Sequence, residues 1–301
     1  MKIKSKMKIN ITQIILHSFF ILITIMCIAP VVLVVMVSIT DNHSIMINGF
    51  SFFPKELSLE AYKYIFYDAK SLVNSYFVTI CITIAGTILS LLITSLYAYP
   101  ISRQDLPYKR FFVFVVFFVM LFNGGLVSSY IINTKILHFN NNVIALLAPF
   151  LITPFNVLIM KTFFGNTIPS SLIEAAQLDG ASELRVYRSI IVPLSKPVLA
   201  TVGLFNTLGY WNDWFSSLLY ISNKSLYTIQ FVMYKSLMNI EFLKNNIAAG
   251  AGGNLAIEVM KAPSQSIRFA MVVIGVGPML LAYPFFQRYF IEGLTVGSIK
   301  G

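Results

Sequence analysis

Long apolar runs separated by short polar segments are the dominant pattern of this chain. The first run contains no Asp, Glu, Lys or Arg from Ile9 to Thr40, and comparable runs follow along the sequence. About 20 apolar residues in a helix cross the hydrocarbon core of a membrane. The pattern predicts an all-α polytopic membrane protein with six transmembrane helices and both termini on one side. The predicted spans are 13–37, 71–102, 111–134, a run that ends at 160, 195–221 and 267–287.

Composition agrees with this class and indicates an orientation. The 301 residues are 57% hydrophobic and 11% charged, whereas soluble proteins carry about 25% charged residues. The net charge of +10 would suggest a nucleic-acid partner in a soluble protein. In a membrane protein it is explained by the excess of Lys and Arg in cytoplasmic loops. Of the 22 Lys and Arg residues, 13 lie on the side of the N-terminus, so both termini are predicted to be cytoplasmic.

The polar segments give the predicted organisation of the chain. The expected parts are a cytoplasmic N-terminal segment at 1–12, a six-helix transmembrane domain at 13–291 and a cytoplasmic C-terminal tail at 292–301. The expected loops are outer loops at about 38–70, 133–141 and 222–266, and a cytoplasmic loop at about 164–194.

The cytoplasmic loop has a helical pattern of its own. Ser171 and Glu174 have the S-x-x-E spacing of a capping box, which predicts a helix start. Gly180 is placed to end this helix, because glycine adopts the left-handed conformation at little cost. A second helix is predicted from Ser182, and Pro193 is expected to end it. The pattern predicts two short helices bent at Gly180, with an ordinary amphipathic loop as the alternative.

The motifs of common catalytic and nucleotide-binding sites are missing from the sequence. There is no G-x-x-x-x-G-K-[ST] phosphate loop, and H-E-x-x-H, G-x-S-x-G and C-x-x-C are also absent. The three histidines are scattered, so no metal-ligand set is expected. We therefore predict that the chain is not an enzyme, has no catalytic residues and binds no metal.

An aromatic and amide cluster near the end of the fifth span could line a path for a polar solute. It consists of Tyr210, Trp211, Asn212 and Trp214. Aromatic rings stack on the apolar faces of sugars, and an amide can bond their hydroxyls. The alternative is an aromatic belt at the outer interface, where Trp and Tyr are enriched in any membrane protein.

Asn123 and Tyr130 in the third span are further candidates for this path. The Asn-Gly-Gly sequence that begins at Asn123 can mark a broken helix near a binding site. It can equally mark close helix packing through small residues.

A more specific pattern lies in the cytoplasmic loop. Its fixed positions are Glu174, Ala175, Ala176, Gly180, Ile190, Val192 and Pro193. This spacing resembles the EAA signature of binding-protein-dependent ABC importer permeases, in which Leu is usual where Val192 stands here. Asp179 fits the sugar-importing branch of that family. Residues 164–194 are called the EAA loop below.

The C-terminal half of the chain extends the resemblance. Residues 293–301 are similar to the ending of MalG-like carbohydrate-uptake permeases. The stretches 210–214 and 262–290 look more like permeases of the LplC and YtcP type, which are associated with complex oligosaccharides. Thr295, Gly297 and Lys300 in the tail are therefore a second candidate contact with an ATPase.

The resemblance implies a type I ABC importer permease fold in the bacterial cell membrane. The implied function is a permease subunit for oligosaccharides or complex glycans, which couples ATP hydrolysis by a separate ATPase to translocation. The implied partners are a second homologous permease, two ATPase subunits that bind the ATP, an extracellular solute-binding protein, the oligosaccharide and membrane lipid. No nucleic acid and no cofactor in this chain are expected. The residues implied in coupling are Glu174, Ala175, Ala176, Asp179, Gly180 and Pro193.

Three alternatives stay open from the sequence. Peptide, phosphonate and metal importers share the EAA loop, so the solute could be something other than a sugar. A membrane enzyme of lipid-linked glycan metabolism would need acidic or histidine residues at the membrane edge, and Asp41, Asp68 and Asp105 form no spaced pair. A secondary transporter would normally show intramembrane charges or an inverted repeat, and neither is evident.

Overall fold

The computed structural model describes residues 11–248 and 264–298. Within these residues the chain is helical apart from loops and one isolated β-bridge between Thr40 and Leu57. The chain divides into two compact units. Unit 1 comprises residues 1–68 and 237–276, and unit 2 comprises residues 69–236 and 277–301.

Unit 1 begins with a long helix that is apolar on all sides. Its elements are α1 (Ile11–Ser38), α2 (Asn42–Asn48), α3 (Glu60–Ile65), η1 (Phe66–Asp68) and parts of α14 (Ile229–Ala248) and α16 (Ser264–Ser298). Most side chains of α1 are exposed, as expected of a helix that faces lipid. Asp41 caps α2 by accepting hydrogen bonds from two backbone N–H groups, and Arg268 bonds Glu241 at 2.7 Å.

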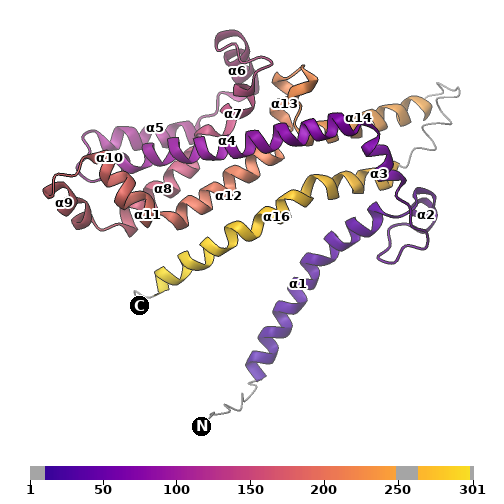
Figure 1. Cartoon of the computed structure of the whole chain (residues 1–301), viewed down its shortest axis with the longest axis horizontal. Helices are drawn as coiled ribbons and strands as arrows, with labels where there is room; N and C mark the ends of the chain where they lie inside the picture. Colours follow the sequence, from indigo (N-terminus) through magenta and orange to yellow (C-terminus); the bar gives the residue numbers. More distant parts are fainter. Residues whose placement is uncertain (1–10, 249–263, 299–301) are drawn as a thin grey trace. The chain divides into compact units, whose positions relative to one another are not determined.

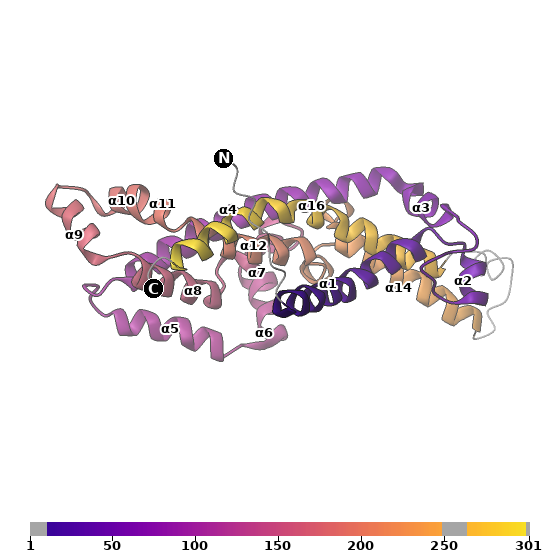
Figure 2. The ribbon, with the colours of Figure 1, turned by 90° about the horizontal axis from the view of Figure 1, so that it is seen from below.

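Unit 2 is built around the 34-residue helix α4 (Ala69–Ser102), which packs against α7, α8 and α12 (Figures 1 and 2). Its other elements are α5 (Lys109–Leu121), α6 (Gly125–Ile131), η2 (Ile132–Ile136), α7 (Val143–Leu151), α8 (Pro154–Thr167), α9 (Ser170–Leu178), α10 (Glu183–Val186), η3 (Tyr187–Ile191), α11 (Val192–Leu194), α12 (Lys196–Asn212), α13 (Phe215–Tyr220) and η4 (Lys224–Leu226).

The buried face of α4 consists largely of small residues at helical spacing, including Thr79, Gly86, Ser90, Thr94 and Ala98. Small side chains let helix backbones approach closely, which is the main source of helix association in a membrane. The small residues on this face therefore explain why α7, α8 and α12 all pack against α4.

Gly86 is the closest of these approaches. A Cβ atom at Gly86 would lie 2.5 Å from the ring of Tyr210 on α12. That ring cannot easily move, because Tyr210 is fully buried, packs edge-on against Phe150 and donates its hydroxyl to the Leu147 carbonyl at 2.7 Å.

A buried chain of hydrogen bonds joins three helices of unit 2. Asn156 on α8 donates to the side-chain oxygen of Asn206 on α12, and Asn206 donates to the Ser90 hydroxyl on α4, each at 2.8 Å. All three side chains are buried. Polar groups at membrane depth need partners inside the protein, so this chain of bonds fixes how the three helices face one another.

The predicted spans appear as three long helices and three bent pairs. Ile11–Ser38, Glu60–Ser102 and Gln265–Pro284 are each long and apolar enough to cross a membrane. The bent pairs are Lys109–Leu121 with Gly125–Ile136 (111°), Val143–Leu151 with Pro154–Thr167 (47°), and Glu183–Leu194 with Lys196–Asn212 (81°). The chain therefore has up to six candidate spans by length and composition within its described residues.

The structure gives detail within three of the expected segments. The fifth span, expected as one run over 195–221, is interrupted after Asn212, where Asp213 bonds the Ser216 N–H at 3.0 Å and starts α13. The expected outer loop 222–266 contains the 20-residue helix α14, and the loop 38–70 contains α2, α3 and η1. The glycine-rich stretch 250–253 lies outside the described residues.

We expect the substitution Gly86→Ala to destabilise the protein. The new methyl group would overlap the Tyr210 ring, and overpacking of a buried contact typically costs about 1–3 kcal/mol. The thermal unfolding midpoint in mild detergent should fall. Gly277→Ala is the control, because a Cβ atom at Gly277 meets nothing within 4 Å. Equal midpoints for the two variants would contradict this packing.

Candidate functional site

The EAA loop folds into two helices joined by a sharp turn at Gly180. The helix α9 ends with paired backbone bonds, in which Gly180 N–H donates to Gln177 and Ala181 N–H donates to Ala176. This pair of hydrogen bonds is the Schellman motif, which requires a residue with positive φ directly after the helix. Gly180 has a φ of +78°. The bend that the sequence predicts is thus present, and α10 begins after Ser182 as expected.

The predicted capping box is wrong. The helix starts two residues earlier than a cap at Ser171 implies, with Pro169 at the position before the first helical residue and no side-chain cap. Ser171 is then the second residue of the helix, where its hydroxyl cannot reach back to satisfy a first-turn N–H. Pro169 favours this start, because proline disfavours helical conformation in the residue before it and permits helix after it.

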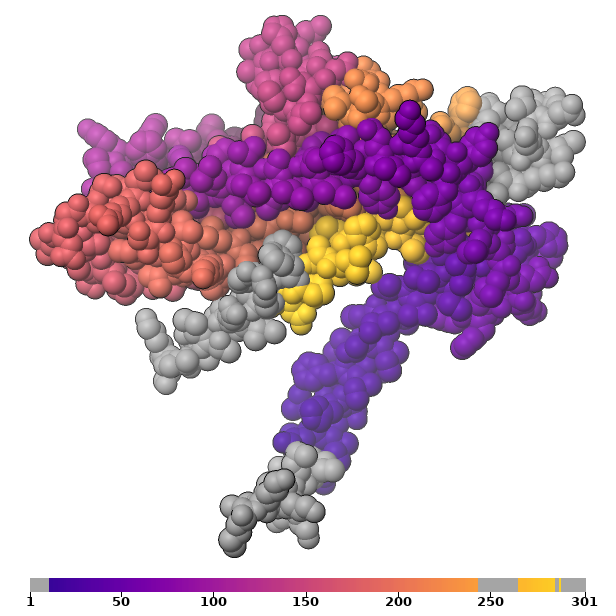
Figure 3. All heavy atoms as spheres, in the orientation of Figure 1, coloured from indigo at the N-terminus to yellow at the C-terminus, as the bar shows by residue number. Residues whose placement is uncertain are grey.

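The two sides of α9 have different surroundings. Ile173 and Ala176 pack against the buried core of unit 2. Ala175 and Asp179 are exposed, and Leu178 is 90% exposed. In the space-filling view, the salmon-coloured segment that contains α9 lies at the surface of unit 2 (Figure 3). The end of α9 therefore presents Leu178 and small side chains to its surroundings.

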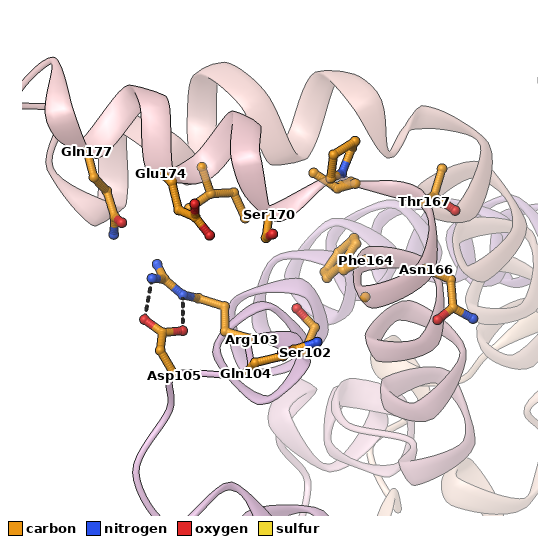
Figure 4. A pocket seen from close by; sticks show the side chains of 14 residues that line it. Ser102, Arg103, Gln104, Asp105, Phe164, Asn166, Thr167, Ser170, Glu174 and Gln177 are labelled. Atoms are coloured by element: carbon orange, nitrogen blue, oxygen red, sulfur yellow. Dashed lines mark hydrogen bonds and ion pairs between the residues drawn. The ribbon is translucent and has the colours of Figure 1, made fainter.

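Glu174 lines a pocket beside α9 rather than capping the helix. The pocket has a volume of about 420 Å³ and lies between α9 and the segment that follows α4. Figure 4 shows Glu174, Gln177 and Ser170 on one side of it, with Arg103 and Asp105 on the other. Its polar lining and exposed position leave the carboxylate of Glu174 accessible.

Arg103, directly after α4, ties the EAA loop to that helix. Its guanidinium donates to both carboxylate oxygens of Glu183 at 2.6 and 2.7 Å, and also bonds Asp105. Tyr99 and Gln177 donate to the same Glu183 carboxylate at 3.0 and 2.7 Å. The Arg103 side chain is only 14% exposed, so one cation between two carboxylates fixes the first turn of α10 to the end of α4.

The charges in this cluster stabilise one another. The hydrogen bond from Arg103 is the largest cause that lowers the pKa of Asp105. Hydrogen bonding to Asp105 likewise raises the pKa of Arg103 above its usual value. Both groups are therefore charged at neutral pH, and a change of pH within the physiological range does not release Arg103.

A second attachment lies one helical turn deeper. The Tyr187 hydroxyl and the Ser95 hydroxyl of α4 share a hydrogen bond of 2.6 Å. The Tyr187 ring lies 5.9 Å from that of Tyr99, and Val186 and Ile191 are buried in the same core. The helical segment after Gly180 is thus held to α4 by polar and apolar contacts together. Pro193 lies one residue before its end at Leu194, slightly inside the end that the sequence predicts.

The candidates for a solute path lie in different surroundings. Tyr210 is a buried packing residue, and Trp211 is buried with its ring 6.4 Å from that of Tyr76. Asn212 is exposed and donates to the Leu208 carbonyl. Trp214 stacks on Tyr234 with ring centres 4.2 Å apart. The structure therefore gives an exposed polar group at Asn212, while Tyr210 and Trp211 are buried.

The Asn-Gly-Gly sequence is a break rather than a packing contact. Asn123 lies between α5 and α6 and accepts a hydrogen bond from the Gly125 N–H at 2.8 Å. Gly125 has a φ of +82° and nothing lies within 4 Å of its Cβ position. Tyr130 on α6 stacks on Tyr220 with ring centres 5.9 Å apart.

The tail candidates are described only in part. The helix α16 continues through Thr295 and Gly297 to Ser298, and Lys300 lies outside the described residues.

Sequence reasoning missed Arg103, Tyr99 and Ser95 as partners of the EAA loop. No local signal marks them, because Arg103 and Glu183 are 80 residues apart. Arg103 stands immediately after an apolar run, but cations are common at that position of a membrane span. Its position therefore does not indicate a role in the EAA loop.

Comparisons with known proteins extend these observations. Residues 111–296 match the family described as binding-protein-dependent transport system inner membrane component. The chain is 32% identical over 98% of its length to the polygalacturonan/rhamnogalacturonan transport system permease protein YtcP of Bacillus subtilis (strain 168), all of which is covered. It is 36% identical over 91% of its length to Protein LplC of the same strain, with 90% of that protein covered.

A solved structure is also similar. It is the crystal structure of a bacterial ABC transporter involved in the import of the acidic polysaccharide alginate. The TM-score is 0.77 at 25% identity, and the match covers 93% of this chain and 96% of the other.

We expect Arg103→Gln to loosen the first part of the EAA loop. Loss of the cation removes the bonds to Glu183, which should cost about 1 kcal/mol, or roughly fivefold in a local opening equilibrium. Hydrogen–deuterium exchange of the amides in residues 170–186 should become faster by about this factor. Arg110→Gln is the control, because Arg110 is a nearby exposed cation outside this cluster. An unchanged exchange rate in Arg103→Gln would show that the Arg103–Glu183 ion pair does not stabilise the EAA loop.

Proposed function

This chain belongs to the family of binding-protein-dependent transport system inner membrane components, and on that basis we propose that it is the permease subunit of an ATP-driven importer for oligosaccharides or complex glycans. In this proposal the chain has no catalysis of its own. Separate ATPase subunits bind and hydrolyse ATP, and this chain converts their movement into opening and closing of a path across the membrane.

The observation that carries the proposal is the exposed, rigidly attached helix α9. Its outward residues Ala175, Leu178 and Asp179 are accessible, whereas Ile173 and Ala176 are packed inward. A cleft on an ATPase subunit could receive this outward side, with Glu174 available to a cation of the partner. The small Ala175 would permit close approach.

Force applied to α9 has a direct route to the membrane spans. It passes through the turn at Gly180 to α10, and then through the Glu183–Arg103 and Tyr187–Ser95 contacts to α4. Since α4 packs against α7, α8 and α12, a displacement of α4 would be transmitted to the helices around it. The tail residues Thr295, Gly297 and Lys300 are a further proposed contact with the ATPase.

The proposed topology has six spans with both termini in the cytoplasm. Each bent pair contributes one span, and in the third pair only Lys196–Asn212 is taken as the membrane part. The EAA loop, with Glu183–Leu194, then lies with the cations that favour the cytoplasmic side. The proposed assembly contains this chain, a second homologous permease, two ATPase subunits and an extracellular solute-binding protein.

The substrate class is supported by the names of the relatives. YtcP is described as a permease of a polygalacturonan/rhamnogalacturonan transport system, and the solved transporter is involved in the import of alginate. A carbohydrate is therefore the proposed solute of this chain as well. Among the path candidates, Asn212 and Asn123 expose polar groups that could bond sugar hydroxyls, and Tyr130 and Trp214 offer aromatic faces.

Affinity purification of this chain from its native membrane in mild detergent tests the assembly. We expect mass spectrometry to find an ATPase and a second permease with an EAA loop in comparable amounts. Any co-purified binding protein can then be screened against acidic and neutral oligosaccharides and against peptides. Recovery of the chain alone in several detergents would overturn the importer proposal, whereas exclusive peptide binding would overturn only the carbohydrate class.

Substitutions at Gly180 test the coupling role of the turn. Gly180→Val should reduce uptake and solute-stimulated ATP hydrolysis by roughly 5- to 30-fold, because a β-branched residue with positive φ costs at least about 1–2 kcal/mol. Gly180→Asn is the matched control, since asparagine tolerates this conformation. Its activity should remain close to that of the unaltered protein. Equal activity of the Val and Asn variants would contradict a need for the left-handed turn.

A further inference from the structure

A groove of about 930 Å³ runs along α5. This helix lies beside α8 (Figure 2). Four of the nine residues that line the groove are phenylalanines. Phe114, Phe118 and Phe122 follow one another at intervals of four residues, with ring centres 6.0 and 4.7 Å apart. These three side chains are exposed. The result is a continuous apolar strip along one face of the helix.

Three cations also line this groove. Lys109 and Arg110 form the first turn of α5, and Lys161 comes from α8. No Asp or Glu lines the groove. Among the residues that the structure describes, none of the three cations forms an ion pair, and Lys109 donates to the Ser102 carbonyl oxygen at 3.1 Å. The adjacent Asp105 is bound to Arg103.

The helix itself adds to the positive potential of the groove. The start of α5 carries the positive end of the helix dipole, and Tyr108 provides no side-chain cap there. Two lysines, an arginine and a helix start therefore contribute positive charge to the groove. Lys109 also acts electrostatically on the Asp105 carboxylate, which Arg103 already binds. Such a groove attracts an anion, and phosphate oxygens suit several donors from more than one helix.

We propose that this groove binds one anionic phospholipid of the cytoplasmic leaflet. Its phosphate-bearing headgroup lies among Lys109, Arg110 and Lys161, and one acyl chain lies along Phe114, Phe118 and Phe122. The cytoplasmic placement rests on the topology given under Proposed function. The binding itself does not depend on the transported solute.

The dimensions and chemistry of the groove fit this occupant. The 13 residues of α5 extend about 20 Å, and one leaflet contributes about 15 Å of hydrocarbon. The strip thus begins at the headgroup level and reaches the middle of the membrane. Basic pockets between helices on the cytoplasmic side are known to select anionic lipid headgroups. A protein partner would need acidic residues opposite the cations and large apolar side chains opposite the phenylalanines. A phospholipid supplies an anionic headgroup and an apolar chain in one molecule.

Native mass spectrometry of the purified complex tests the proposal. The complex is exchanged into detergent with equal amounts of phosphatidylglycerol and phosphatidylcholine of the same acyl chains. We expect phosphatidylglycerol to be retained in about tenfold excess, and the excess to vanish in the triple variant Lys109→Gln, Arg110→Gln, Lys161→Gln. The control triple variant Lys55→Gln, Lys63→Gln, Lys224→Gln removes the same charge elsewhere and should keep the preference.

A second pair of variants tests the apolar part of the site without changing charge. Phe118→Trp should crowd the strip and lower the retention of phosphatidylglycerol toward that of the triple variant. Val119→Trp is the matched control, because Val119 is exposed on α5 but does not line the groove. Retention should then be unchanged.

Two outcomes would overturn the proposal. One is an undiminished phosphatidylglycerol preference in the Lys109, Arg110, Lys161 variant. The other is photo-crosslinking from benzoylphenylalanine at position 118 that yields a second protein chain, and not lipid, as the main product in the assembled complex. Both readouts are independent of transport activity, so they distinguish failure of the lipid site from failure of the importer function.

Discussion

The contact of Arg103 with Glu183 is the interaction on which the proposed coupling role of the EAA loop depends. A surface helix can pass a displacement to the membrane only if it is fixed to a span. The α9 helix packs Ile173 and Ala176 against the core, and its Gln177 donates to the Glu183 carboxylate. The bonds from Arg103, Tyr99 and Gln177 to a single carboxylate make the start of α10 part of the end of α4.

Polar groups at membrane depth constrain the rest of unit 2. Ser90, Asn156 and Asn206 satisfy one another across three helices. Because hydrocarbon offers no replacement partner, rotation of any one of these helices would break bonds that water cannot replace. The close contact of Gly86 with Tyr210 also holds α4 against α12 in this region. A movement that starts at the EAA loop is therefore expected to shift α4, α8 and α12 as a group.

Some features of this structure are readable from the sequence, and others depend on tertiary contacts. The first two spans and the Gly180 turn were predictable, because apolar length and glycine conformation are local properties. The helix α9 starts earlier than the capping pattern predicts, since Pro169 changes which residue begins the helix. The ion pair between Arg103 and Glu183 was not predictable, because the sequence around neither residue indicates it and only tertiary packing brings the two together. The helix α14 was missed because Lys235, Asn239 and Glu241 interrupt its apolar positions.

The break between α5 and α6 is exposed in the part of the chain that the structure describes. Residues 122–124 lie outside regular helix, although the Phe122 N–H still bonds the Phe118 carbonyl, so the irregular backbone is at 123 and 124. Only the Asn123 side chain compensates, by accepting the Gly125 N–H. Irregular backbone is tolerated at membrane depth where protein covers it or where it lines a water-filled cavity. A break in a transmembrane pair of helices, uncovered within its own chain, therefore fits either a second subunit or an aqueous path at that point. Both belong to the assembly proposed for this permease, and the second would bring Asn123 and Tyr130 to the solute.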